Sequence, residues 1–169
     1  MRFLRRVAAG AAAGTIAGIA VAVFYFVVGA VRLQPFVVPV TLSSELLRAG
    51  NIAATAGEAA RLASLESLGA QVVTYTVLHL LIFAVVGVVA AFILDLRSFW
   101  LSLLGGAAYG SVACTALLYA SGWIAATPIA VHSLGLRSVL LANAMAGGVL
   151  GLALHLRHQM HLGGDDAGR

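Results

Sequence analysis

Charged residues are scarce in this chain, and lysine is absent. The 169 residues include ten arginines and six acids, so only 9% of the sequence is charged. The arginines lie at the ends of apolar stretches and form no basic stripe, which argues against nucleic-acid binding. A single cysteine, Cys114, excludes an internal disulfide.

Motifs for catalysis are missing as well. The sequence contains no GxSxG, HExxH, CxxC or phosphate-binding loop, and no paired carboxylates. Most of the chain consists of apolar stretches, so there is no room for a soluble catalytic domain. We therefore expect a protein that is not an enzyme.

The sequence is rich in apolar residues, since 62% of its residues are hydrophobic. Four stretches run without a charge for about twenty residues, which is enough to cross a bilayer. They are residues 7–31, 72–94, 99–120 and 138–156. The sequence therefore predicts an all-α integral membrane protein, with a single membrane domain over residues 1–169 and four transmembrane helices packed as a bundle.

Between the first two spans lies an external segment, residues 32–71. Its alanine-rich part, Ile52 to Leu68, is weakly amphipathic and predicts a helix. This helix would lie on the outer membrane surface, dock on a neighbouring subunit or cover the protein's own bundle. A second external loop is expected over residues 121–137, and a tail over 157–169 that is disordered from His158 onward.

The arginines predict the orientation, because cytoplasmic segments retain the excess of positive charge. Six arginines lie on the side of the two termini and four on the other. The six are Arg2, Arg5, Arg6, Arg97, Arg157 and Arg169, and the four are Arg32, Arg48, Arg61 and Arg137. Both termini are therefore expected in the cytoplasm. An arginine-led, glycine-patterned first helix is common in small bacterial membrane proteins, so we expect a multi-pass protein of the bacterial inner membrane.

Small residues recur at every fourth position in three of the spans, as in a glycine zipper. The rows are Gly10, Gly14 and Gly18; Ser102, Gly106, Gly110 and Cys114; and Asn143, Gly147 and Gly151. Such rows let helix backbones approach closely in lipid. We expect the seven glycines to pack helices together, mainly within the bundle, with room for one row to contact another chain.

Uncharged polar residues form the second intramembrane feature, whereas no Asp, Glu, Lys or Arg lies in the interior of a span. That absence argues against a proton- or sodium-coupled transporter. Tyr25, His79, Thr115 and Asn143 each lie roughly 9 to 12 Å below the outer boundary at 1.5 Å per residue. The sequence predicts that these four side chains form one polar layer.

His79 is the sharpest candidate for a binding site. It shares a helix face with Tyr75, Phe83, Gly87 and Ala91. Three uses are open: a core histidine bonded to Asn143, Tyr25 or Thr115, which we favour; an axial ligand to haem or a chlorophyll-type pigment; and an element of a proton or ion pathway.

The other histidines lie toward the cytoplasmic end. His155 lies near the opposite face of the membrane, so it is too far from His79 in depth for both to bind one haem iron. His155, His158 and His161 fan around their helix, so the three do not predict a metal site.

The expected function is that of a non-catalytic accessory or assembly subunit of a larger bacterial membrane protein complex. Its partners would be membrane lipids and other subunits, or further copies of itself, and no cofactor is required. One alternative is a pigment- or haem-carrying subunit with His79 as axial ligand. A second is a small homo-oligomeric channel or permease.

Overall fold

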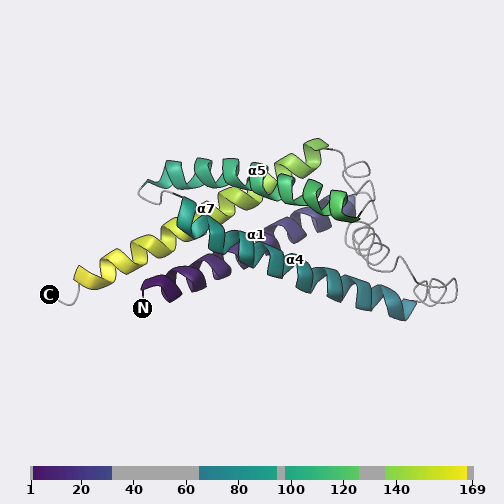
Figure 1. Cartoon of the computed structure of the whole chain (residues 1–169), viewed down its shortest axis with the longest axis horizontal. Coiled ribbons are helices and arrows are strands. Elements are labelled where there is room, and N and C mark those ends of the chain that lie inside the picture. The colour runs from purple at the N-terminus through teal and green to yellow at the C-terminus, as the bar shows by residue number, and fades with distance from the viewer. Residues whose placement is uncertain (1, 32–64, 95–97, 126–135, 167–169) are drawn as a thin grey trace.

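A computed structural model describes residues 2–31, 65–94, 98–125 and 136–166. In these ranges the chain forms four helices, α1 (Arg2–Val31), α4 (Leu65–Ile93), α5 (Phe99–Ala125) and α7 (Leu136–Asp166), and no strand (Figure 1). Each helix contains a segment long and apolar enough to cross a membrane. The prediction of an all-α chain with four candidate spans is therefore confirmed. The predicted amphipathic helix lies outside the described residues, except for its last residues, 65–68, which begin α4.

The helices alternate in direction along the chain. The two termini, the end of α4 and the beginning of α5 lie at the same end of the molecule (Figure 1). Ser98 lies immediately before α5, and its carbonyl accepts the first helical hydrogen bond from the Ser102 amide at 2.9 Å. Serine is a favoured residue at this N-terminal cap, so α5 begins where the local sequence supports it.

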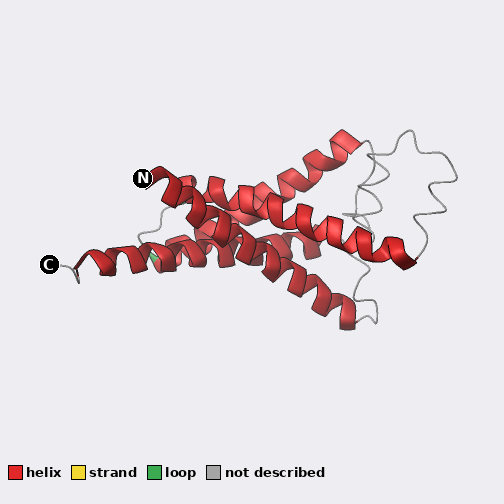
Figure 2. Ribbon diagram, turned by 90° about the horizontal axis from the view of Figure 1, so that it is seen from below, coloured by secondary structure: helices red, strands yellow, loops and turns green. Residues whose placement is uncertain are grey.

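The four helices pack as two pairs. α1 packs along α4, α5 packs along α7, and the pairs meet where α1 contacts α7. The spatial order is therefore α4, α1, α7, α5, and α4 has little contact with the second pair. The helices cross near their middles and spread apart toward the end away from the termini (Figure 2).

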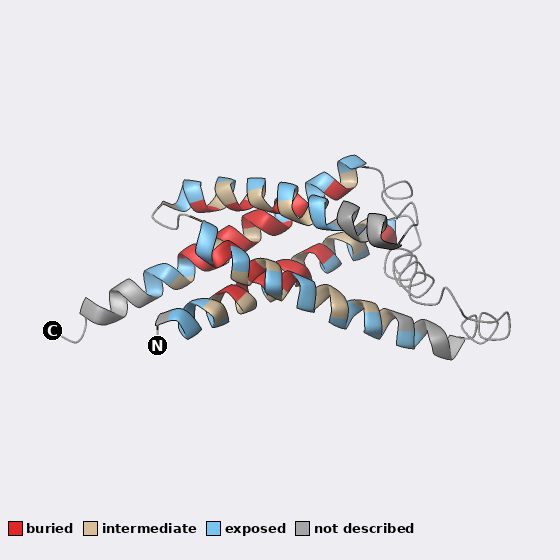
Figure 3. Cartoon of the chain, viewed as in Figure 1, coloured by how far each residue is buried: buried red, intermediate tan, exposed pale blue. Residues whose placement is uncertain are grey.

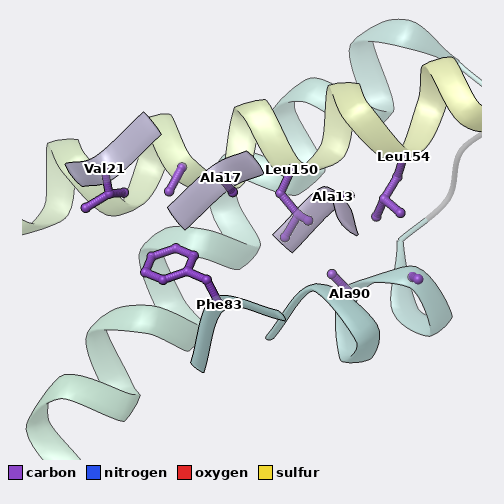
Figure 4. Packing of buried hydrophobic residues seen from close by; sticks show 9 residues of the cluster. Ala13, Ala17, Val21, Phe83, Ala90, Leu150 and Leu154 are labelled. Atoms are coloured by element: carbon purple, nitrogen blue, oxygen red, sulfur yellow. The ribbon is translucent and has the colours of Figure 1, made fainter. Parts of the chain in front are cut away.

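Small side chains fill the core, and large apolar side chains cover the outside. Buried residues gather at the helix crossings, while the outer faces of the helices are exposed (Figure 3). In the centre, Leu150 and Leu154 of α7 approach Ala13 and Ala17 of α1 (Figure 4). Phe83 of α4 packs on the other side of α1. α7 is the most buried helix and α5 the least.

The C-terminal tail differs from its prediction. α7 continues to Asp166, so the prediction of a disordered tail from His158 is wrong for the residues through Asp166. Extending an existing helix adds one hydrogen bond for each residue fixed, without a new nucleation cost. The charge and polarity of the tail therefore do not end the helix.

Arg6 connects the beginning of α1 to the end of α4. Its Nε donates a 2.7 Å hydrogen bond to the carbonyl of Ala91, and its guanidinium lies 5.1 Å from the ring centre of Phe92. Ala91 is in the last turn of α4, where carbonyls have no helical partner and the helix dipole is negative. Arg6 therefore acts as a C-terminal cap supplied by another helix.

We expect Arg6→Ala to lower the free energy of unfolding by about 0.3–1 kcal/mol, the usual range for a charge at a helix end. Chemical unfolding in mixed micelles measures this loss. Arg5→Ala is the matched control, because Arg5 is exposed and has no such contact among the described residues. Equal losses in the two variants would contradict the capping role.

Candidate functional site

Glycines bring the backbones of α5 and α7 into direct contact. A Cβ atom built on Gly106 would collide with the carbonyl oxygen of Gly147, and one built on Gly147 would collide with the carbonyl oxygen of Gly106. The contact continues in both directions, because Gly110 meets the backbone of Asn143 and Gly151 meets that of Ser102. These two predicted rows therefore face each other.

The predicted row on α1 faces α4. A Cβ on Gly10 would lie 2.7 Å from the carbonyl oxygen of Gly87, and one on Gly14 would collide with the carbonyl oxygen of Phe83. A Cβ on Gly18 would lie 3.0 Å from the Cβ of Phe83. Sequence reasoning did not include Gly87 among the packing glycines, although its place four residues before Ala91 was a signal. All seven predicted glycines lie at contacts within the chain.

His79 lies in the contact between α4 and α1. Its Nε2 is 3.0 Å from the carbonyl oxygen of Gly18. A carbonyl oxygen only accepts hydrogen bonds, so Nε2 carries the proton and donates. Nδ1 is then an acceptor, and it lies 3.4 Å from the hydroxyl of Tyr75. The imidazole lies between the rings of Tyr75 and Phe83, with ring centres 5.4 and 4.7 Å away and ring planes tilted by 30° and 45°.

These contacts use both ring nitrogens of His79. A protonated Nε2 has no lone pair for haem iron or pigment magnesium. Axial ligation would have to displace the Gly18 carbonyl from Nε2 or the Tyr75 hydroxyl from Nδ1, and would take the ring from its place between two aromatic rings. The geometry therefore favours a structural histidine over a metal ligand.

Asn143 and Thr115 join α7 to α5. The Nδ2 of Asn143 donates a 3.0 Å hydrogen bond to the Oγ1 of Thr115. His79, in contrast, bonds to α1 and to its own helix, and Tyr25 packs against the apolar core. The predicted polar layer is thus divided: Asn143 and Thr115 meet in one helix pair, and His79 and Tyr25 belong to the other.

This division predicts additive effects of mutation. His79→Ala and Asn143→Leu should each cost about 0.6 kcal/mol, a typical membrane hydrogen bond. The double variant should lose the sum to within about 0.5 kcal/mol, as separate sites do. Thr115→Val combined with Asn143→Leu should cost less than its sum, because both remove one bond. Free energies of unfolding provide the measurement, and coupling between His79 and Asn143 would contradict the division.

Two polar contacts were not anticipated from the sequence. Ser102 Oγ lies 3.5 Å from Nδ1 of His155, and both side chains are buried between α5 and α7. The signal for Ser102 was its place in the row with Gly106. Among the described residues, no three His, Cys, Asp or Glu side chains gather into a metal site.

The second unanticipated contact is made by Tyr109. Its hydroxyl donates a 3.0 Å hydrogen bond to the carbonyl of Val86, and so joins α5 to α4 across the two pairs. Tyr109 precedes Gly110, which places it beside the glycine contact and on a face turned toward α4. Helical spacing identifies the face of α5 on which Tyr109 lies, but it does not identify the helix that this face contacts.

The fold and these contacts define a class of protein: in its described residues the chain is helical, with four candidate membrane spans that cross through backbone contacts at glycine. Comparison with protein-family models, curated proteins and solved structures gave no match.

Proposed function

We propose that this chain is a multi-pass protein of the bacterial inner membrane and a non-catalytic accessory or assembly subunit of a larger complex. One observation carries the proposal. His79 and Asn143 are the polar side chains of the candidate spans best suited to chemistry. Both form hydrogen bonds between or within helices. Their use in packing supports a structural protein.

The distribution of large and small side chains supports membrane insertion. Residues with almost no exposed surface include Ala13, Ala17, Ala142 and Ala146, whereas the outward faces carry leucine, valine, isoleucine and phenylalanine. Exposed apolar surface of this extent would cause association in water. In lipid it is solvated, and close packing of small residues supplies the attraction between helices.

The uncovered faces of α4 and α5 support the role of a subunit. Leu104 and Val112 of α5 are 63% and 71% exposed, and Val73 and Val85 of α4 are 62% and 61% exposed. The glycine rows, in contrast, are occupied inside the chain. Contacts with lipid or with another subunit therefore fall on large exposed apolar side chains, among them those of α4 and α5.

Native mass spectrometry of the protein extracted from its own membrane in mild detergent tests the proposal. We expect masses in which this chain is accompanied by at least one different chain in a fixed ratio. A ring of identical chains would favour the channel alternative, and a monomer alone would contradict a subunit role. Bound haem or chlorin mass that is lost in His79→Ala would overturn the assignment of His79.

The proposed orientation places both termini in the cytoplasm, since six of the ten arginines then lie on that side. Trypsin added to intact spheroplasts is expected to cut only after external arginines, which are Arg32, Arg48, Arg61 and Arg137. Trypsin added to inverted vesicles is expected to cut at Arg157 or near the N-terminus. The opposite pattern would reverse the topology.

A further inference from the structure

The contacts within each helix pair differ in kind from those between the pairs. Within the pairs, backbone meets backbone at Gly14 and Phe83 and at Gly106 and Gly147. Directional bonds reinforce both contacts, from His79 to Gly18 and from Asn143 to Thr115. Displacing one helix along its partner would drive carbonyl groups into the neighbouring backbone, so each pair is a stiff unit.

Where the pairs meet, the contact is made by apolar side chains. Ala13, Ala17 and Val21 of α1 belong to one buried apolar cluster with Ala146, Leu150 and Leu154 of α7, and Leu150 lies beside Ala13 and Ala17 (Figure 4). The alanines offer only methyl groups, and dispersion contacts of this kind have no preferred direction. In lipid, leaving such a contact carries little hydrophobic penalty. Packed helices with interfaces of this kind move against each other by shear.

A directional bond nevertheless crosses between the pairs. The Tyr109 hydroxyl of α5 donates to the Val86 carbonyl of α4 at 3.0 Å, and the tyrosine ring packs against the core. Val86 lies well inside α4, so its carbonyl position is fixed by the helix. The bond therefore ties one stiff pair to the other at a defined register.

We propose that the two helix pairs move as rigid bodies about the contact between α1 and α7, and that the bond from Tyr109 to Val86 latches them in the arrangement observed. Release of the latch changes the relative position of the outer faces of α4 and α5. Those faces belong to different pairs, so the latch controls the shape of the surface that they present together.

Distances between spin labels in lipid nanodiscs test the latch. Labels are placed at three exposed positions after Val27→Cys in α1, Val73→Cys in α4 and Leu117→Cys in α5, in a Cys114→Ala background. The distance from residue 73 to 117 crosses between the pairs, and the distance from 73 to 27 lies within one pair. Tyr109→Phe removes the hydroxyl and keeps the ring.

With Tyr109→Phe, we expect the distribution between the pairs to shift or widen by about 1–2 Å, the scale of sliding between packed helices. The distribution within the pair should remain unchanged, which also shows that the variant is folded. Ser111→Ala is the matched control, because it removes a hydroxyl that bonds only to Ala107 of the same helix at 2.9 Å.

Three results would overturn the proposal. The first is an unchanged distribution between the pairs in Tyr109→Phe. The second is equal widening within and between the pairs, because the pairs would then not be rigid. The third is the same widening in Ser111→Ala, because the effect would then not come from the bond to Val86.

Discussion

Gly106→Ala is expected to lower the free energy of unfolding by about 2–3 kcal/mol, in the range of overpacked cores. The added methyl group would collide with the Gly147 carbonyl and lie 3.0 Å from the Cα of Gly151. Both obstacles are backbone atoms, so no side chain can turn away to make room. α5 and α7 must separate, and the bond between Asn143 and Thr115 should weaken with them.

Gly105→Ala provides a control at the neighbouring residue. A Cβ on Gly105 meets only the end of the Leu94 side chain, at 3.8 Å. Alanine also favours the helix, so stability should be unchanged or raised by up to about 1 kcal/mol. Unfolding in mixed micelles measures both variants. Equal effects at positions 105 and 106 would show that the glycine face of α5 is not the packed one.

Gly14→Leu is expected to have a still larger effect, above about 3 kcal/mol, because a branched side chain is placed where even a methyl group does not fit. A Cβ on Gly14 collides with the Phe83 carbonyl and lies 3.1 Å from the Cα of Ala84. Separation of α1 from α4 would also break the bond from His79 to Gly18. Thermal unfolding of the protein in detergent, followed by size-exclusion chromatography, measures the loss of stability.

Ala22→Leu is the matched control for Gly14→Leu. Ala22 lies on the exposed face of α1, so the same leucine would extend into the surrounding lipid or detergent. We expect Ala22→Leu to elute and melt as the parent protein does. A Gly14→Leu protein that behaves in the same way would mean that α1 does not cross α4 at this residue.

The four helices that the described residues form could be predicted from the sequence, because the length and apolar composition of each stretch determine them. A run of about twenty uncharged residues has few folded alternatives to a helix of that length. Glycine spacing likewise predicted the close contacts, because residues four apart lie on one helix face. Gly106, Gly147 and Gly14 all lie at backbone contacts.

The choice of partner helices could not be predicted in the same way. Spacing gives the face that a row occupies on its own helix, and nothing in the row at Gly10 to Gly18 indicates α4 instead of α5 or α7. The partner face on α4 combines Gly87 with Phe83 and His79, so it did not resemble a row of small residues. Shape complementarity between those faces decides which helices pair, and it depends on how their side chains are arranged in three dimensions.

The polar layer shows the limit of reasoning from depth alone. Counting residues placed His79 and Asn143 at a similar level, but depth says nothing about rotation around the helix axis. In the structure these residues belong to different helix pairs, with Gly18 and Thr115 as their respective partners. Thr115 and Asn143 were correctly grouped, since their helices are also adjacent in space.

The imidazole of His79 offers the most direct test that polar side chains in these spans hold helices together and do not bind a cofactor. Nitrogen-15 NMR of the histidine-labelled protein in lipid reports the state of each ring nitrogen. We predict a neutral ring with Nε2 protonated and close to the Gly18 carbonyl carbon, and Nδ1 unprotonated. An unprotonated or metal-bound Nε2, with no contact to Gly18, would contradict the structural role of His79.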